Sequence, residues 1–192
     1  MQNAGFLISA KNVFYQIERP DLVSWNAIIA GFAYGGDAYE AMSFFSQMRH
    51  LGLNTDEITV RSLLCAFTSP MTLYQGLQVH SYIIKMGFSL DVPVCNTLLT
   101  MYAKCSDLCV AFNMFKEVKN TADLVSWNAI LTACLQHKQA GEVFRFLKLM
   151  LISQNKPNHI TLTSILGACT ETASLEMGNQ VHCYSVKTGA RA

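Results

Sequence analysis

The eight residues DLVSWNAI occur twice in this chain, at Asp21–Ile28 and again at Asp123–Ile130, an offset of 102 positions. Ungapped alignment of residues 21–90 with residues 123–192 gives 26 identities in 70 positions. Similarity at a fixed spacing is typical of chains that stack equivalent units, because each unit buries its apolar face only against its neighbours. The sequence therefore predicts a repeat array.

The offset of 102 residues divides at turn-forming segments that end in aspartate. Counting from Asp21 to Asp56, Asp91 and Asp123 gives steps of 35, 35 and 32 residues. Units of this length with helical patterning are pairs of stacked helices. We therefore expect an all-α fold, an α-solenoid of helix-turn-helix repeats.

The apolar spacing predicts where these helices lie. Ser24 is expected to cap the first helix of the first full pair, and Gly52 to end the second. The apolar stripe of that second helix has the spacing i, i+3, i+4, i+7 and comprises Ala41, Phe44, Phe45 and Met48. Further helices are expected at 6–17, 59–67, 73–86, 94–104, 107–118, 126–137, 142–152, 161–169 and 174–188.

Composition excludes several other classes of protein. With 51% apolar residues in 192 the chain can bury a core, its net charge of +1 gives no general basic field, and no apolar run is long enough to cross a membrane. The seven cysteines form no CxxC pair, so neither metal nor disulfide is expected. Without a recognisable catalytic set or phosphate loop, we expect a protein that is not an enzyme and has no cofactor.

The repeats open with V-S-W-N-A-I and close on a G-x-x-x-D turn, and this pattern resembles the pentatricopeptide repeat. The cycle of 35, 35 and 32 residues is similar to the plant PLS subclass, whose fold is a right-handed superhelix. In these terms residues 22–56 and 124–158 resemble P-type repeats, 57–91 and the truncated 159–192 resemble L-type repeats, and 92–123 resembles an S-type repeat. Residues 1–21 resemble the second helix of another S-type repeat.

This resemblance implies binding of single-stranded RNA at about one base per repeat, each base read by two or three side chains. An asparagine amide both donates and accepts, which suits the pairing edge of a base. The readout residues are expected at the fifth and last positions of each repeat. These are Asn26 with Asp56, Asn96 with Asp123, Asn128 with Asn158, Arg61 with Asp91, and Thr163 without a partner position.

The family's code suggests uracil for asparagine with aspartate, and a pyrimidine that favours cytosine for asparagine with asparagine. The expected RNA core is then 5′-U-N-U-C/U-3′. Apolar residues at the second position of each repeat should flank the bases, and Lys104 should contact a phosphate. The flanking residues are Val23, Ile58, Pro93, Val125 and Ile160.

Alternatives remain open at this point. A tetratricopeptide repeat has a similar period, but a glycine should follow Trp25 and Trp127 four residues later, and none does. A protein-binding α-solenoid without base readout would need Asp56, Asp91 and Asp123 only as helix caps. Partly exposed amides at Asn26, Asn96 and Asn128, along one concave groove, would favour readout, whereas buried amides would favour the scaffold.

The resemblance also implies a place and partners for the protein. PLS proteins act in mitochondria or chloroplasts and often choose sites for cytidine-to-uridine editing, and here an enzyme in another domain or in trans would supply the chemistry. In the helix expected at 73–86, the buried stripe should comprise Leu73, Leu77 and Ile84. We expect His80 and His182, which fall on such a stripe, and both tryptophans to be buried. Exposed apolar residues at the array ends should form a homodimer; they are Phe6, Leu7, Phe14 and the segment 181–186.

Overall fold

The computed structural model describes residues 2–105 and 107–188. Every regular element within these ranges is a helix, which confirms the all-α prediction. The chain divides into two compact units, Met1–Cys105 and Ser106–Ala192. The last residues of the expected final repeat, 189–192, lie outside the described ranges.

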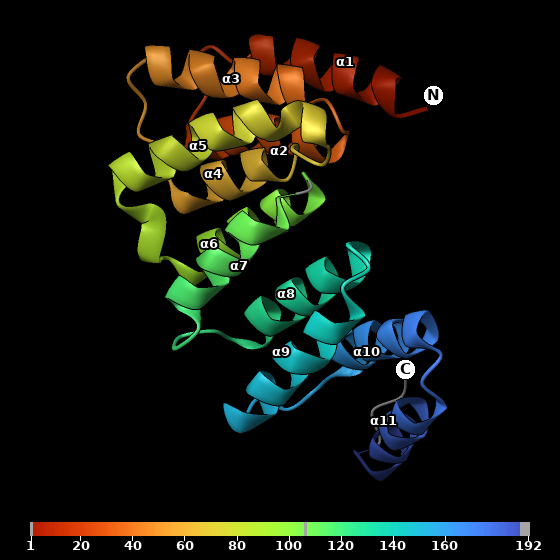
Figure 1. Ribbon diagram of the computed structural model, residues 1–192. Helices are drawn as coiled ribbons and strands as arrows, with labels where there is room; N and C mark the ends of the chain where they lie inside the picture. Colours follow the sequence, from red (N-terminus) through yellow and green to blue (C-terminus); the bar gives the residue numbers. More distant parts are fainter. Residues whose placement is uncertain (1, 106, 189–192) are drawn as a thin grey trace. The chain divides into compact units, whose positions relative to one another are not determined.

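The first unit contains six α-helices and two short 3₁₀ turns among its described residues (Figure 1). Helices α2, α4 and α6 open successive repeats and pack side by side, while α3 and α5 contact them as second helices. Their bounds are α1 Gln2–Tyr15, α2 Leu22–Tyr34, α3 Ala38–His50, α4 Glu57–Leu64, α5 Leu73–Met86 and α6 Val92–Lys104, with 3₁₀ turns η1 Pro70–Thr72 and η2 Phe88–Leu90.

The second unit repeats this arrangement. Helices α8 and α10 pack side by side as first helices, α9 contacts both, and α11 contacts α10. Their bounds are α7 Leu108–Val118, α8 Leu124–Gln136, α9 Ala140–Ile152, α10 His159–Thr172 and α11 Leu175–Thr188. Each unit therefore presents a row of first helices.

The cap of α2 differs from the prediction. Asp21 is the N-cap, and its carboxylate accepts hydrogen bonds from the backbone N–H of Ser24 at 2.8 Å and from the Ser24 hydroxyl at 2.6 Å. The helix therefore starts at Leu22, because a carboxylate three residues before Ser24 satisfies the free N–H groups better than a serine already inside the first turn. Gly52 has a φ of 71° just after α3, which is the left-handed conformation expected there.

The apolar stripe predicted on α3 is fully buried and forms the centre of an aromatic cluster. Trp25 lies against Phe14 of α1, with ring centroids 4.7 Å apart, and Phe14 packs edge-on against Phe44 at 5.4 Å. Trp127 packs similarly against Phe115 of α7 at 4.8 Å. Both tryptophans are buried, as predicted, and hold neighbouring helices together.

The stripe predicted on α5 is wrong. Leu77 and Ile84 are exposed, and the helix instead buries Gly76, Val79 and Ile83. A hydropathy pattern misses Gly76 because glycine has no side chain, yet its bare backbone is where Met101 of α6 packs. Burial on α5 is therefore set by a close helix approach.

Near the ends of the array, the burial of several residues also differs from the prediction. Phe14 and Val181 are buried, because Phe14 fills the aromatic cluster and Val181 lies beside Leu162 and Ile165 of α10. Phe6 is exposed, as expected. His182 is exposed, contrary to prediction, because it lies on a face of α11 that no described helix covers. At α1 the exposed apolar residues are therefore Phe6, Ile8, Val13 and Tyr15, and Phe14 is not among them.

Within the described ranges, no helix has the length and apolar character needed to cross a bilayer. No group of three His, Cys, Asp or Glu side chains among the described residues could hold a metal ion. All seven cysteines are free thiols, and Cys95, Cys105, Cys134 and Cys169 are buried.

Candidate functional site

In the first unit, Asn26 of α2 binds two residues at the start of α4. Its Nδ2 donates to the Asp56 carboxylate, at 3.1 Å to Oδ1 and 3.3 Å to Oδ2. Its Oδ1 lies 2.6 Å from the hydroxyl of Thr59. Both ends of the Asn26 amide are therefore held by the following repeat.

Asp56 and Thr59 are arranged this way because together they cap α4. The Thr59 backbone N–H donates to Asp56 Oδ1 at 2.8 Å, and the Asp56 N–H donates to Thr59 Oγ1 at 3.3 Å, which closes a capping box. The single Thr59 hydroxyl hydrogen is shared between Asn26 Oδ1 and Asp56 Oδ1, the latter 2.7 Å away. The cap thereby joins two repeats.

The second unit contains the same arrangement with asparagine in place of aspartate. Asn128 Nδ2 donates to Asn158 Oδ1 at 3.2 Å, and the Thr161 hydroxyl donates to Asn128 Oδ1 at 2.6 Å. Asn158 caps α10 through its Oδ1, which accepts the Thr161 backbone N–H at 3.1 Å. This geometry recurs 102 positions along the chain, so it belongs to the repeat itself.

The two sites differ in charge. Burial of the Asp56 carboxyl raises its pKa, but hydrogen bonds from Thr59 and Asn26 outweigh that effect and leave the pKa below its usual value. Asp56 is therefore a carboxylate that only accepts. The Oδ1 of Asn158 accepts hydrogen bonds from within the protein. Its Nδ2 has no partner among the described residues, so it offers N–H donors.

The third expected pair, Asn96 and Asp123, belongs to different units. Asp123 caps α8 by accepting the Ser126 N–H at 2.8 Å. Asn96 is 6% exposed and Asn128 is 7% exposed, whereas Asn26 is half-buried. By the criterion of amide exposure, Asn26 favours base readout, and the burial of Asn96 and Asn128 favours the scaffold.

The expected flanking residues all lie at the surface. Each occupies the second position of a first helix, one turn away from the fifth-position side chain. Their exposure contrasts with the buried third position beside them, where Thr59, Ser126 and Thr161 have almost no accessible surface. The exposed flanking residues are Val23, Ile58, Pro93, Val125 and Ile160.

The expected sites in the remaining repeats are simpler. Arg61 and Thr163 are exposed, and the Thr163 hydroxyl donates to the His159 carbonyl of its own helix at 2.9 Å. Asp91 caps α6 by accepting the Val94 N–H at 2.9 Å. Lys104 is exposed at the end of α6. Within the described ranges, no side chain of the following repeat forms a hydrogen bond with Arg61 or Thr163 in the way that Asp56 does with Asn26.

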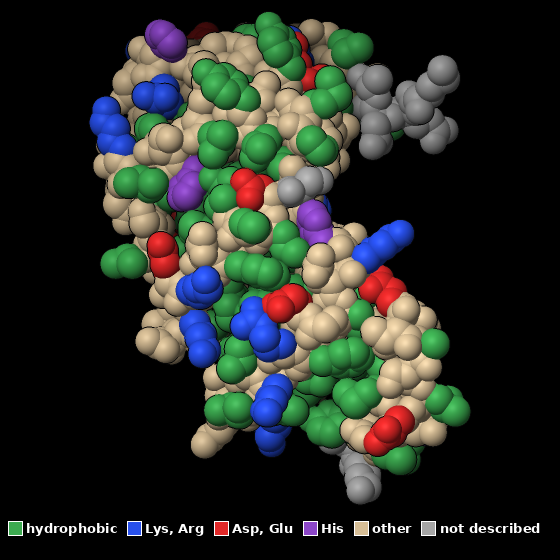
Figure 2. Space-filling model, in the orientation of Figure 1, with side chains coloured by type: hydrophobic (Ala, Val, Ile, Leu, Met, Phe, Trp, Pro, Cys, Tyr) green, Lys and Arg blue, Asp and Glu red, His purple; other side chains and the backbone are tan. Residues whose placement is uncertain are grey.

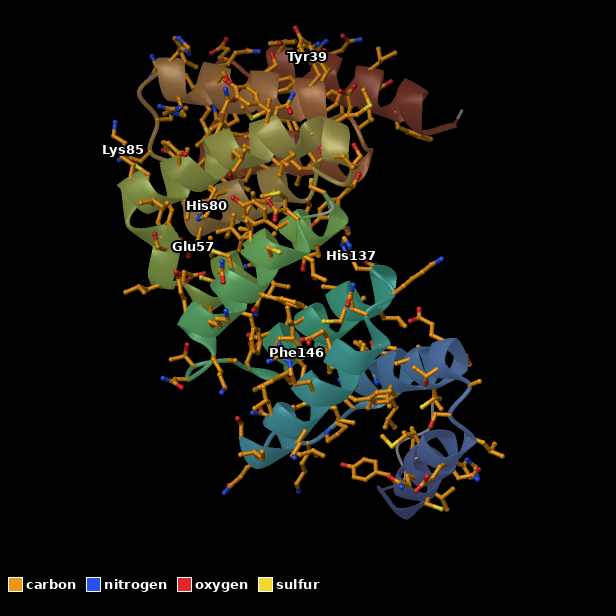
Figure 3. The ribbon with its side chains drawn as sticks, viewed as in Figure 1. Tyr39, Glu57, His80, Lys85, His137 and Phe146 are labelled. Atoms are coloured by element: carbon orange, nitrogen blue, oxygen red, sulfur yellow. The ribbon has the colours of Figure 1, made fainter. Side chains whose placement is uncertain are left out.

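Second helices carry other polar contacts. His80 extends from α5 towards α6, where its Nδ1 lies 2.6 Å from the Tyr102 hydroxyl (Figure 3). It is half-buried and hydrogen-bonded, so it serves packing between these helices. In the second unit, Lys and Arg side chains gather over α7 and α9 (Figure 2). The exposed basic residues of these two helices are Lys116, Arg145 and Lys148. They lie on second helices, apart from the candidate readout residues.

The sequence interpretation missed Thr59 and Thr161. Both occupy the third position of a repeat, three residues after a capping Asp or Asn, where a hydroxyl suggests only a capping box. A signal was nevertheless present, since a hydroxyl residue follows each readout asparagine one repeat later.

Residues 20–69 and 122–171 match the PPR repeat family. The chain belongs to this family.

Relatives in Arabidopsis thaliana are also pentatricopeptide repeat proteins. A mitochondrial one is 61% identical over 185 residues, which cover 96% of this chain and 24% of the relative. A chloroplastic one is 30% identical over 185 residues, covering 96% of this chain and 20% of the relative. The chain thus spans a quarter or less of the length of these two relatives.

Solved pentatricopeptide repeat structures share the helical fold. Maize PPR10 in complex with an 18-nt psaJ RNA element has a TM-score of 0.70 at 19% identity, over 95% of this chain and 33% of that one. The PPR domain of Arabidopsis thaliana protein-only RNase P 1 in complex with tRNA has a TM-score of 0.65 at 16% identity, over 85% of this chain and 88% of that one. These likenesses confirm the α-solenoid fold.

Proposed function

We propose that this chain binds single-stranded RNA sequence-selectively, at about one base per repeat. The observation that carries the proposal is the recurring junction in which a fifth-position asparagine is held by the capping residues of the next repeat. Ordinary helix capping needs no such asparagine. The edge of a base needs a hydrogen-bonding group and its face needs apolar contacts. A fixed amide beside exposed apolar residues provides both.

The two junctions offer different groups to a base. Near Asn26, the Asp56 carboxylate adds acceptors, which suits the N3–H donor of uracil. Near Asn128, the free Nδ2 of Asn158 adds donors, which suits the N3 acceptor of cytosine. This chemistry supports the first and fourth bases of the order 5′-U-N-U-C/U-3′, which Asn26 and Asn128 read; uracil at the third base rests on the family's code for Asn96 with Asp123.

The flanking residues supply stacking without sequence preference. Val23 lies three residues before Asn26, and Ile58 lies two residues after Asp56. Val125 and Ile160 have the same positions relative to Asn128 and Asn158. Aromatic stacking contributes about 1 to 3 kcal/mol per base, and aliphatic contacts lie at the low end of that range. Lys104 contributes a phosphate contact, and with one such contact binding should weaken only modestly with added salt.

Binding of labelled 12-mer RNAs at low salt tests this proposal. A core of U-N-U-C is compared with cores that carry a purine at the first or the fourth base, for the wild type, Asn26→Ala and Asn128→Ala. The wild type should prefer pyrimidines, and each substitution should erase the preference at its own base. Asn113→Ala, an exposed asparagine on α7, is the control. Absence of binding, or equal binding to all cores, would contradict the proposal.

The cellular role we propose is to mark organellar transcripts, in mitochondria or chloroplasts, for processing or for C-to-U editing. In it this chain binds, and an editing or processing enzyme in another domain or in trans supplies the chemistry. Support comes from the relatives described as mitochondrial and chloroplastic. Loss of the chain should then leave a specific site unedited or unprocessed when organelle RNA is sequenced, and an unchanged transcriptome would contradict this role.

A second candidate function is a protein-binding scaffold, which the burial of Asn96 and Asn128 favours. It predicts no base preference in the binding assay.

For self-association, we propose pairing of two copies through α1, whose Phe6, Ile8 and Val13 are exposed. Light scattering at high concentration should then detect a dimer that Val13→Lys disrupts, and a wild-type monomer would contradict it.

A further inference from the structure

Thr59 and Thr161 each hold a side chain that belongs to the preceding repeat. Their hydroxyls lie 2.6 Å from the Oδ1 atoms of Asn26 and Asn128, which are 33 residues earlier. Both threonines are fully buried. A hydroxyl needed only for capping would have no reason to lie against the asparagine of another repeat.

At the junction formed by Asn128, Asn158 and Thr161, the direction of each side-chain hydrogen bond follows from one backbone group. The Thr161 N–H can only donate, so Asn158 must turn its Oδ1 towards it. The same Oδ1 accepts from Asn128, which must therefore present Nδ2. The Oδ1 of Asn128 then faces the Thr161 hydroxyl, its one protein donor among the described residues. That hydroxyl holds the amide in this orientation from its other end and occupies one of its two acceptor positions.

The sequence repeats this association. Asn26, Asn96 and Asn128 are followed one repeat later by Thr59, Ser126 and Thr161, each at the third position. Where the fifth position is Arg61, the corresponding later residue is Val94, which has no hydroxyl and is buried. In this chain the hydroxyl accompanies the asparagine. Capping does not explain the difference, because Asp91 also caps a helix before Val94.

We infer that Thr59 and Thr161 are positioning residues that set the base preference of the repeat before their own. Each orients the asparagine amide so that one N–H and one acceptor position remain for the base. The inference rests on the proposed function, and it assigns specificity in one repeat to the third residue of the next. A repeat is then incomplete as a reading unit without the start of its neighbour.

The test replaces the hydroxyl while keeping the shape of the side chain. Thr161→Val should lower the preference for cytosine over adenine at the fourth base by roughly 3- to 10-fold, the effect of losing one hydrogen bond. The preference for uracil over adenine at the first base should be unchanged. Thr59→Val should do the reverse, and Thr161→Ser should restore the wild-type preference, because serine keeps the hydroxyl.

Controls separate positioning from general loosening. Thr72→Val removes a hydroxyl that caps η1 through Ser69 and touches no asparagine, so it reports the cost of a lost cap alone. Thermal denaturation of every variant confirms folding. The inference is overturned if Thr161→Val lowers both base preferences equally, or if it leaves the fourth unchanged while Asn128→Ala erases it.

A measurement without RNA keeps this inference distinct from the proposed function. The side-chain amide protons of Asn128 should exchange with solvent faster in Thr161→Val than in Thr161→Ser, as followed by NMR. If the wild type shows no base preference, the proposed function fails, and the exchange rates still report whether the hydroxyl holds the amide. Equal exchange rates in the two variants would overturn the positioning role itself.

Discussion

The hydroxyl of Thr161 lies 2.6 Å from the Oδ1 of Asn128, across the junction between two repeats. The same threonine closes the capping box of α10 with Asn158. One side chain therefore serves both the start of a helix and the orientation of the preceding repeat's amide. Stability of the junction and the chemistry offered to a ligand are coupled as a result.

Asp56→Asn should reduce the acid sensitivity of the first unit. The Asp56 carboxyl has a folded pKa below its ordinary value of 3.8, so its stabilising contribution is present above that value and is lost as the pH falls through the folded pKa. Because the side chain is half-exposed, we expect a difference below about 1 kcal/mol. Urea midpoints measured between about pH 5 and pH 2 should fall further for the wild type than for the variant.

Asn158 shows that asparagine is accepted at this position and can form the same junction. The substitution is therefore expected to preserve the fold at neutral pH. Asp21, whose pKa is also lowered, is common to both proteins, so it cancels in the comparison. Parallel pH profiles for the two proteins would show that Asp56 contributes nothing to the acid response.

The fold was predictable because its signal is repeated. Helix pairs and the α3 stripe follow from periodicity, since equivalent residues recur at each step of about 35 positions. The α5 stripe was misplaced because its buried face contains Gly76, which carries no apolar side chain to count. Its burial depends on Met101, a residue of the next repeat. Contacts of this kind are absent from any pattern within one helix.

The candidate site was predictable only in part, for a similar reason. The fifth and last positions came from the resemblance to pentatricopeptide repeats, and the structure brings Asn26 onto Asp56 and Asn128 onto Asn158. Thr59 was missed because its hydroxyl has two uses, and the one visible in the sequence is capping. Pairing across 33 residues depends on how repeats stack, which local spacing does not encode.

Alanine at Gly76 and alanine at Gly178 should have opposite effects, although the two glycines are equivalent in the repeat. A Cβ at Gly76 would lie 2.6 Å from the Sδ of the buried Met101, whereas a Cβ at Gly178 would meet nothing within 4 Å. Gly178→Ala should stabilise by about 0.5 to 1 kcal/mol through helix propensity. Gly76→Ala should destabilise, because overpacking costs about 1 to 3 kcal/mol.

Thermal denaturation of both variants checks this prediction directly. Met101→Ala in the Gly76→Ala background should recover part of the loss, since it removes the atoms that collide. An increase in melting temperature for Gly76→Ala alone would mean that Met101 moves aside without cost.

Cys134 should resist alkylation at neutral pH. Burial, together with the nearby Glu142, raises the pKa of its thiol to about 12, so almost none of it is thiolate near pH 8. Cys109 is exposed and should react readily. Iodoacetamide labelling followed by peptide mapping compares the two sites in one sample. Equal labelling of the folded protein would show that α8 opens on the timescale of the reaction.

Val125→Ala should weaken RNA binding without changing stability. The side chain is 61% exposed, so its truncation removes little buried area, and the free energy of unfolding should change by less than about 0.5 kcal/mol. If Val125 flanks a base, affinity should fall by roughly 2- to 5-fold, and Val125→Tyr should raise it, because an aromatic ring stacks better.

Val186→Ala is the matched control for this substitution, since Val186 is an equally exposed valine on the second helix α11 of the same unit. It should leave RNA affinity unchanged. The comparison separates a flanking surface on first helices from general adhesion of RNA to apolar side chains. Equal losses for Val125→Ala and Val186→Ala would place the RNA elsewhere than along the second positions of the repeats.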